Sequence, residues 1–152
     1  MTHLYPKLLV SNYADINGRI PDINRGGCGI FAEELYNTLI KLGNKPQIYI
    51  ITRFNINDVL EAIANDNTYG FSFNHIIIKI GKYYYDSNGK RTIEDYRDIY
   101  GSNISFVNCS IEYLNKLNAN IDVWNDTFNR NKTKNIQAVL EKAFKKIVLN
   151  TK

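Results

Sequence analysis

The spacing of apolar positions changes at residue 28, where an irregular, glycine-containing stretch gives way to a helical pattern. The apolar residues after Cys28 recur at three- and four-residue spacing: Phe31, Leu35, Leu39 and Leu42. Such spacing lines one face of a helix, and Gly43 follows as a residue that commonly ends one. We therefore predict a loop over residues 11–27 and an amphipathic helix over about 28–42.

Alternating and aromatic segments after this helix predict strands. Residues 47–54 alternate in polarity and are rich in β-branched side chains, and residues 57–63 supply a cap at Asn57 and a short helix. Residues 71–80 and 83–86 are strand-like, and Gly81-Lys82 between them suits a tight turn, because glycine tolerates the positive φ that such turns need. The pattern predicts a β-hairpin.

The rest of the chain continues to mix both kinds of element. We predict a helix over 92–100 with Thr92 as its cap, a strand over 104–107, a helix over 110–117 and a last amphipathic helix over 133–149. Helices that segregate from a small antiparallel sheet indicate the α+β class. Without repeats or linker-like stretches, we expect one domain over residues 1–152.

Composition and charge narrow the functional classes. Hydrophobic residues make up 44% and charged residues 22% of the chain, which is ordinary for a globular domain. No run approaches a membrane span and the start lacks the pattern of a signal peptide, so we expect a cytoplasmic protein. The net charge of +4 is spread among acidic residues, so nucleic acid is not an expected partner, and Lys142 to Lys146 fit a solvated helix face.

Candidate chemistry begins at Cys28. The two cysteines, Cys28 and Cys109, fit neither a metal spacing nor a disulfide framework, so we expect a free thiol and neither metal nor cofactor. A helix N-terminus favours a thiolate, and the neighbours Gly26, Gly27 and Gly29 would leave the sulfur open to a substrate. The alternative is that Cys28 is a small buried hydrophobic residue.

A reactive thiol needs a base, and His75 is the candidate, because the other histidine, His3, lies close to the start of the chain. If Ile80 pairs with Tyr83, then His75 faces Asn88, and Asp86 lies on the same face of the sheet. Either Asp86 or Asn88 could accept the Nδ1 proton of His75. The alternatives are a structural imidazole and a plain turn over residues 86–89.

The order of these features resembles the papain-like superfamily in its broad sense, which includes transglutaminase-like and NlpC-type domains. The shared features are a glycine-rich loop, a cysteine at a helix start, a strand that begins with histidine and a strand that ends in aspartate, and they span about 28–89. The resemblance implies that Cys28 is the nucleophile, His75 the base and Asp86 the acid that orients it. It also implies a cysteine-bearing helix packed on a small antiparallel sheet.

The chain departs from papain in two places. Papain has a glutamine oxyanion donor six positions before its cysteine, where this chain has Asp22, so Asn24 or Asn17 could take that role. We include Asn24, Gly27 and Asn88 as candidate oxyanion or substrate-binding residues. Papain's third residue also lies far downstream of its histidine, whereas Asp86 follows His75 closely, which favours the smaller members of the superfamily.

We therefore expect a cysteine hydrolase or acyltransferase that acts on a peptide, protein or other amide or ester through a thioacyl intermediate. Peptidase, isopeptidase, deamidase and transglutaminase all remain open, and the small size fits a viral or phage protein. The competing hypothesis is a catalytically inactive binding or inhibitor protein on the same fold, and a basic nucleic-acid binder comes third. Trp124 is either a groove residue or a core aromatic.

Overall fold

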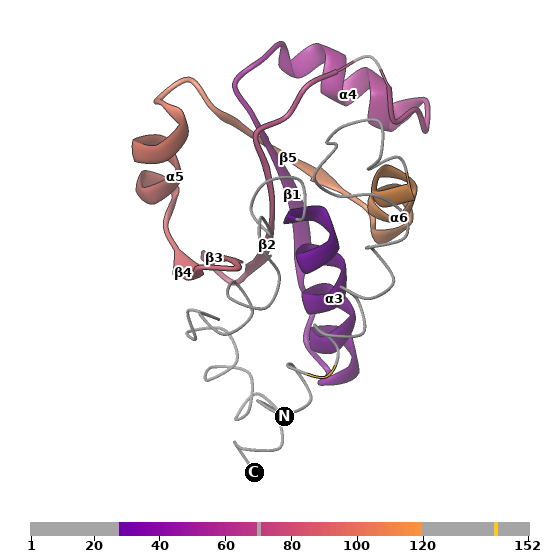
Figure 1. The fold of residues 1–152 in the computed structure, drawn as a ribbon, viewed down its shortest axis with the longest axis vertical. Coiled ribbons are helices and arrows are strands. Elements are labelled where there is room, and N and C mark those ends of the chain that lie inside the picture. Colours follow the sequence, from indigo (N-terminus) through magenta and orange to yellow (C-terminus); the bar gives the residue numbers. More distant parts are fainter. Residues whose placement is uncertain (1–27, 70, 120–141, 143–152) are drawn as a thin grey trace.

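A computed structural model describes residues 28–69, 71–119 and 142, and its regular elements belong to both structural classes (Figure 1). The helices are α3 (Cys28–Lys41), α4 (Ile56–Ala64), α5 (Ile93–Tyr100) and α6 (Ile111–Ala119). The strands are β1 (Gln47–Thr52), β2 (His75–Ile80), β3 (Tyr83–Asp86), β4 (Gly89–Arg91) and β5 (Ser105–Cys109). This confirms the α+β class.

The five strands form one antiparallel sheet in the order β4-β3-β2-β1-β5. The predicted hairpin is confirmed as β2 and β3, with Ile80 opposite Tyr83 and Ile78 opposite Tyr85. Gly81 in its turn has a φ of 59°, the left-handed conformation that favours glycine at this position. The register of β2 fixes which of its side chains share a face with His75.

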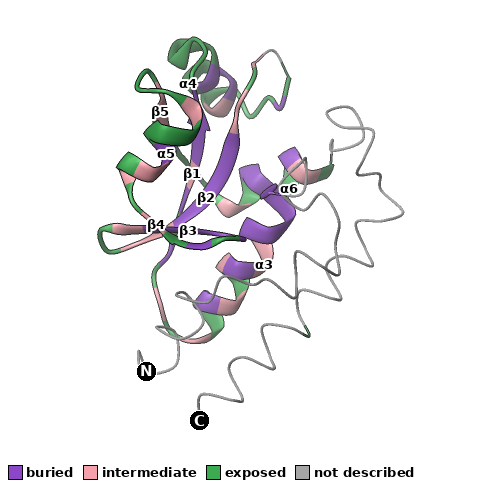
Figure 2. Cartoon of the chain, turned by 60° about the vertical axis from the view of Figure 1, so that its left-hand side comes forward, coloured by how far each residue is buried: buried purple, intermediate pink, exposed green. Residues whose placement is uncertain are grey.

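Each face of the sheet carries its own buried cluster. Helices α3 and α6 pack together on one face, while α5 lies on the opposite side of β1 and β2 (Figure 1). Ile76 and Ile78 of β2 pack in the cluster with α3, whereas Ile77 packs with Tyr96 of α5. Figure 2 shows that burial is concentrated in β1, β2 and the inner side of α3. The alternation of β2 thus directs His75 to the α5 side.

The start of α3 lies very close to α6. Nδ2 of Asn118 donates to the carbonyl oxygen of Gly29 over 3.0 Å and also contacts Oε1 of Glu33 at 3.2 Å. A Cβ at position 29 would overlap Oδ1 of Asn118. The absence of a side chain at Gly29 therefore allows the close approach of Asn118 on α6, while its effect on access to the Cys28 sulfur stays a prediction.

Two element boundaries differ from the predictions because local side-chain hydrogen bonds decide them. Helix α4 is capped by Asn55 rather than Asn57, since Oδ1 of Asn55 accepts from the backbone N–H of Asn57 over 3.0 Å. Strand β1 ends at Thr52, where the Thr52 hydroxyl accepts from the N–H of Phe54 over 3.1 Å. These contacts turn the chain two residues before the predicted end of the strand.

Strand β2 begins at His75 rather than at residue 71. Immediately before it, the backbone N–H of Asn74 donates to Ile51, and the Asn74 side chain accepts from the N–H of Arg53 over 3.0 Å. Asn74 thus links the start of β2 to the end of β1, and His75 is the first residue of the central strand.

Several predictions concern residues outside the described part of the chain. These are the loop over 11–27, the helix over 133–149, and the residues Asn17, Asn24, Gly26, Gly27 and Trp124. Among the residues that are described, no helix is long and apolar enough to cross a membrane.

Candidate active site

The three predicted site residues stand at the ends of three elements. Cys28 is the first residue of α3, His75 is the first of β2, and Asp86 is the last of β3. Because β2 and β3 pair antiparallel, the start of β2 and the end of β3 lie at the same end of the hairpin, and Cys28 at the start of α3 is close enough to act on His75. The fold therefore brings together side chains that are far apart in the sequence.

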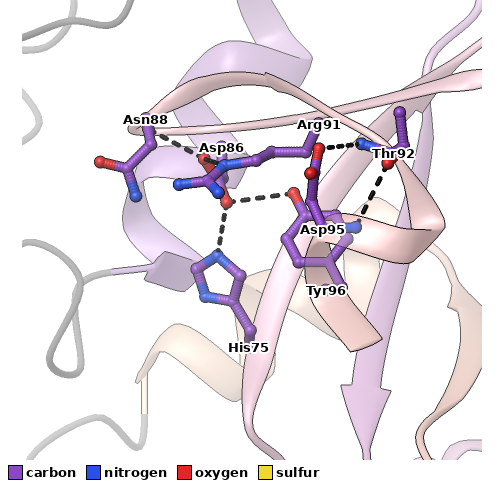
Figure 3. A network of polar contacts seen from close by, with 7 residues as sticks. All are labelled: His75, Asp86, Asn88, Arg91, Thr92, Asp95 and Tyr96. Atoms are coloured by element: carbon purple, nitrogen blue, oxygen red, sulfur yellow. Dashed lines mark hydrogen bonds and ion pairs between the residues drawn. The ribbon is translucent and has the colours of Figure 1, made fainter. Parts of the chain in front are cut away.

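His75 and Asp86 form a direct contact in a buried setting (Figure 3). Nε2 of His75 lies 3.0 Å from Oδ2 of Asp86, and each residue is only 4% exposed. The sequence analysis assigned this contact to Nδ1, which was wrong, because the imidazole enters from β2 with Nε2 toward the carboxylate.

Cys28 also interacts with His75, because a side-chain hydrogen bond with Cys28 and the charge of Cys28 both act to raise the pKa of His75. Cys28 is 8% exposed and lies in the cluster of α3, and both Cys28 and Cys109 are free thiols. Cys28 is therefore both a buried residue of the core and a polar partner of the imidazole. The three side chains form a continuous series from thiol to imidazole to carboxylate.

Asn88 does not face His75, contrary to the register extrapolated from the first hairpin. The chain reverses again after Asp86, and Asp86 pairs with Gly89 of β4 across the two-residue turn Ser87-Asn88. Gly89 has a φ of 98°, so the backbone leaves the β3 direction here. The backbone N–H of Asn88 instead donates to Oδ1 of Asp86 over 2.8 Å, so Asn88 holds the acid rather than the base.

Two residues that the sequence analysis did not select complete the surroundings of Asp86. The hydroxyl of Tyr96 donates to Oδ2 of Asp86 over 3.0 Å, and Nε of Arg91 lies 3.9 Å from Oδ1 (Figure 3). The sequence does predict the helix that carries Tyr96, through its cap at Thr92. Which side chain of that helix returns to Asp86 depends on how α5 packs on the sheet, and no local pattern encodes that.

The electrostatics of the pair follow from burial opposed by hydrogen bonds. Burial, the largest single effect, lowers the pKa of His75, but hydrogen bonds to Asp86 and Cys28 and their charges together raise it to about 9. Burial likewise acts to raise the pKa of Asp86, yet the bond to His75, the His75 charge, the Asn88 N–H and Arg91 hold that pKa below its usual value. The favoured state is an imidazolium beside a carboxylate.

Tyr100, at the end of α5, forms another wall of the site. Its ring centroid lies 5.9 Å from that of His75, and the side chain is half-buried. Burial and then the charges of Cys28 and Asp86 raise the pKa of Tyr100 to about 12. Tyr100 therefore keeps its hydroxyl proton near neutral pH.

The chain was compared with protein families, characterised proteins and solved structures. No match was found in any of the three. Within residues 28–69 and 71–119, no three His, Cys, Asp or Glu side chains are placed to hold a metal ion.

Proposed function

We propose that Cys28, His75 and Asp86 form the active site of a cysteine-dependent hydrolase or acyltransferase that acts on an amide or ester. The observation that supports this most strongly is the buried contact of His75 with Asp86, beside a Cys28 that also acts on the pKa of His75. A nucleophile, a base and a group that orients the base are the recurring parts of covalent acyl transfer.

In the proposed reaction the sulfur attacks the carbonyl carbon of the substrate from the thiolate form of Cys28, beside the His75 imidazolium. The new C–S bond forms as the carbonyl electron pair moves to oxygen. When that pair returns, the bond to the leaving amine or alcohol breaks, and the imidazolium donates its proton to the leaving group. Asp86 stabilises the imidazolium throughout, as the raised pKa of His75 reflects.

The resulting thioester is then attacked by water in a hydrolase, or by an amine in a transferase. His75, neutral after donating its proton, takes a proton from that second nucleophile, the C–S bond breaks, and the Cys28 thiolate and the His75 imidazolium are restored. Peptidase, isopeptidase, deamidase and transglutaminase chemistry all use this sequence of bonds. They differ in the group that enters and in the nucleophile that resolves the thioester.

The oxyanion that forms on the substrate needs donors close to Cys28. The first N–H groups of a helix have no carbonyl partner within the helix, so the first turn of α3 can supply one. Asn24 and the backbone of Gly27 remain the proposed source of a second donor. We also propose that the fold is a small papain-like one, supported by the Cys-His-Asp order and by a cysteine helix packed on an antiparallel sheet.

A panel of activated esters tests this proposal, because a thiolate with an oxyanion site cleaves such esters whatever its natural substrate. We expect a burst of product in the wild type, no burst in Cys28→Ala or Cys28→Ser, and a much slower reaction in Asp86→Ala. Cys109→Ala is the matched control, since it also removes a buried thiol and should keep the burst. If the folded wild type gives no burst with any ester, the chain is a binding or inhibitor protein instead.

A further inference from the structure

We propose that Tyr96 is a positioning residue of the same site, holding Asp86 in the orientation that His75 requires. This rests on the proposed function, but it identifies a residue that neither the sequence pattern nor the order of catalytic residues reveals. The supporting relationship is a shared atom. Oδ2 of Asp86 accepts from the Tyr96 hydroxyl over 3.0 Å and contacts Nε2 of His75, also over 3.0 Å.

The partners of the Asp86 carboxylate divide between its two oxygens. Oδ1 accepts from the Asn88 backbone and faces Arg91, while Oδ2 serves Tyr96 and His75. The contacts at Oδ1 come from the turn and from β4, whereas the contact of Tyr96 with Oδ2 comes from α5. Within the described part of the chain, loss of the Tyr96 hydroxyl would leave Oδ2 with the imidazole that it has to orient as its one hydrogen-bond partner.

Tyr96 itself is held rigidly by α5. Thr92 and Asp95 form a capping box, in which the Thr92 hydroxyl accepts from the Asp95 N–H over 3.2 Å and the Asp95 carboxylate accepts from the Thr92 N–H over 2.8 Å. This fixes the first turn of α5, so that Tyr96 starts the next turn facing the sheet (Figure 3).

Aromatic packing prevents the phenol from moving aside. The Tyr96 ring meets the rings of Tyr84 and Phe106 at centroid distances of 6.2 Å each, both nearly edge-on, and that of His75 at 6.1 Å. Tyr96 is 0% exposed, and burial with the charge of Asp86 raises its pKa, so the hydroxyl keeps its proton and remains a donor. A fixed donor of this kind is suited to set the direction of a carboxylate.

Removing the hydroxyl should change how the site titrates. Asp86 faces His75, Tyr96, Arg91 and the Asn88 N–H, and His75 in turn faces Cys28 and Tyr100. Loss of one donor disfavours the ionised carboxylate, so Asp86 would accept a proton at a higher pH. A neutral Asp86 no longer stabilises the imidazolium, so the thiol becomes less reactive on the acid side of the profile.

The test measures the rate of Cys28 alkylation by iodoacetamide from pH 4 to 10, in a Cys109→Ala background so that one thiol reports. The acid limb is the part of this pH–rate profile in which alkylation slows as the pH falls. We expect Tyr96→Phe to move it to higher pH. Ester turnover, measured beside it, should show kcat about tenfold lower with KM unchanged, as expected for a lost hydrogen bond to a charged group. The two proposals can fail separately. If the wild type shows no ester turnover but Tyr96→Phe still shifts the alkylation profile, the proposed function is refuted and the positioning role of Tyr96 is upheld.

The matched control is Tyr113→Phe. Tyr113 is also buried, and its hydroxyl donates to the carbonyl oxygen of Asn67 over 2.6 Å, on the side of the sheet where α6 packs. An acid limb that is identical in Tyr96→Phe and Tyr113→Phe would overturn the proposal. If Tyr96→Phe does not fold, 3-fluorotyrosine at position 96 replaces it. Its phenol is more acidic and therefore a stronger donor, so the acid limb should move to lower pH. An acid limb that does not move would refute the positioning role of Tyr96.

Discussion

Nε2 of His75 lies 3.0 Å from Oδ2 of Asp86, with both side chains almost completely buried, so the two ionise as a pair. The pKa of His75 is raised from about 6.5 to about 9, so the stability it contributes is complete below pH 6.5 and is lost as the pH rises through 9. The pKa of Asp86 is lowered, so its contribution is present above its usual value of 3.8 and is lost as the pH falls through the folded value.

The pair should therefore stabilise the fold most between about pH 4 and 6.5. The measurement is the free energy of unfolding in urea, as the difference between wild type and His75→Gln/Asp86→Asn over pH 3 to 10. We expect this difference to be largest in that window and to shrink on both sides. A difference that stays constant across the whole range would show that the two groups are not ionised as a pair.

The two thiols should differ in reactivity although they are equally buried. Cys28 is 8% and Cys109 7% exposed, so access alone predicts equal rates of alkylation. Burial raises the pKa of Cys109 to about 12, whereas Cys28 stands at the first residue of α3 and beside His75. We expect iodoacetamide to modify Cys28 well below the pH at which Cys109 reacts, and His75→Gln to remove most of the difference. Equal rates across pH 5 to 9 would exclude an activated thiol.

The contact between α3 and α6 predicts that Gly29→Ala is destabilising. A methyl group at this position would overlap the Asn118 amide, and overpacking of this kind costs about 1 to 3 kcal/mol. Alanine normally favours a helix over glycine, so helix propensity alone predicts the opposite sign. Adding Asn118→Ala should relieve part of the penalty, and a thermodynamic cycle measured by urea unfolding checks this. Strict additivity of the two changes would argue against the contact.

The cap of α5 offers a test of how the helix supports the site. Thr92→Ala removes the hydroxyl that accepts from Asp95 and should lower the free energy of unfolding by about 1 kcal/mol. Tyr96 begins the next turn of α5. Ester turnover should therefore fall even at temperatures where the variant remains fully folded, so that the loss of stability does not account for the decrease. Thr38→Ala is the control, since the Thr38 hydroxyl donates only within α3 to the Glu34 carbonyl over 2.9 Å.

Local patterns predicted those parts of the fold that local interactions determine. The helix after residue 27, the turn at Gly81 and the cap at Thr92 each follow from residues close together in the sequence. The register of the hairpin then placed His75 and Asp86 on one face, and the structure brings them together.

The remaining features depend on contacts between elements, which periodicity does not encode. The turn at residues 87–88 redirects Asn88, because a strand pattern extrapolated past Asp86 cannot show that the chain reverses there. Gly29 was interpreted through its neighbour Cys28, but its nearest contact is Asn118, which lies on a helix formed much later in the chain. Tyr96 reaches Asp86 only through the packing of α5 on the sheet.

The most direct test of the central claim is to locate an acyl group on the protein during turnover of an activated acetyl ester. Intact-mass measurement of the quenched reaction, followed by peptide mapping, should find one acetyl group on Cys28, formed within the burst and lost during turnover. The adduct should be absent in Cys28→Ser, slow to form in Asp86→Ala and unaffected in Cys109→Ala. A folded wild-type protein that acquires no acetyl group on Cys28, or acquires it no faster than on Cys109, would contradict the proposed thiol active site.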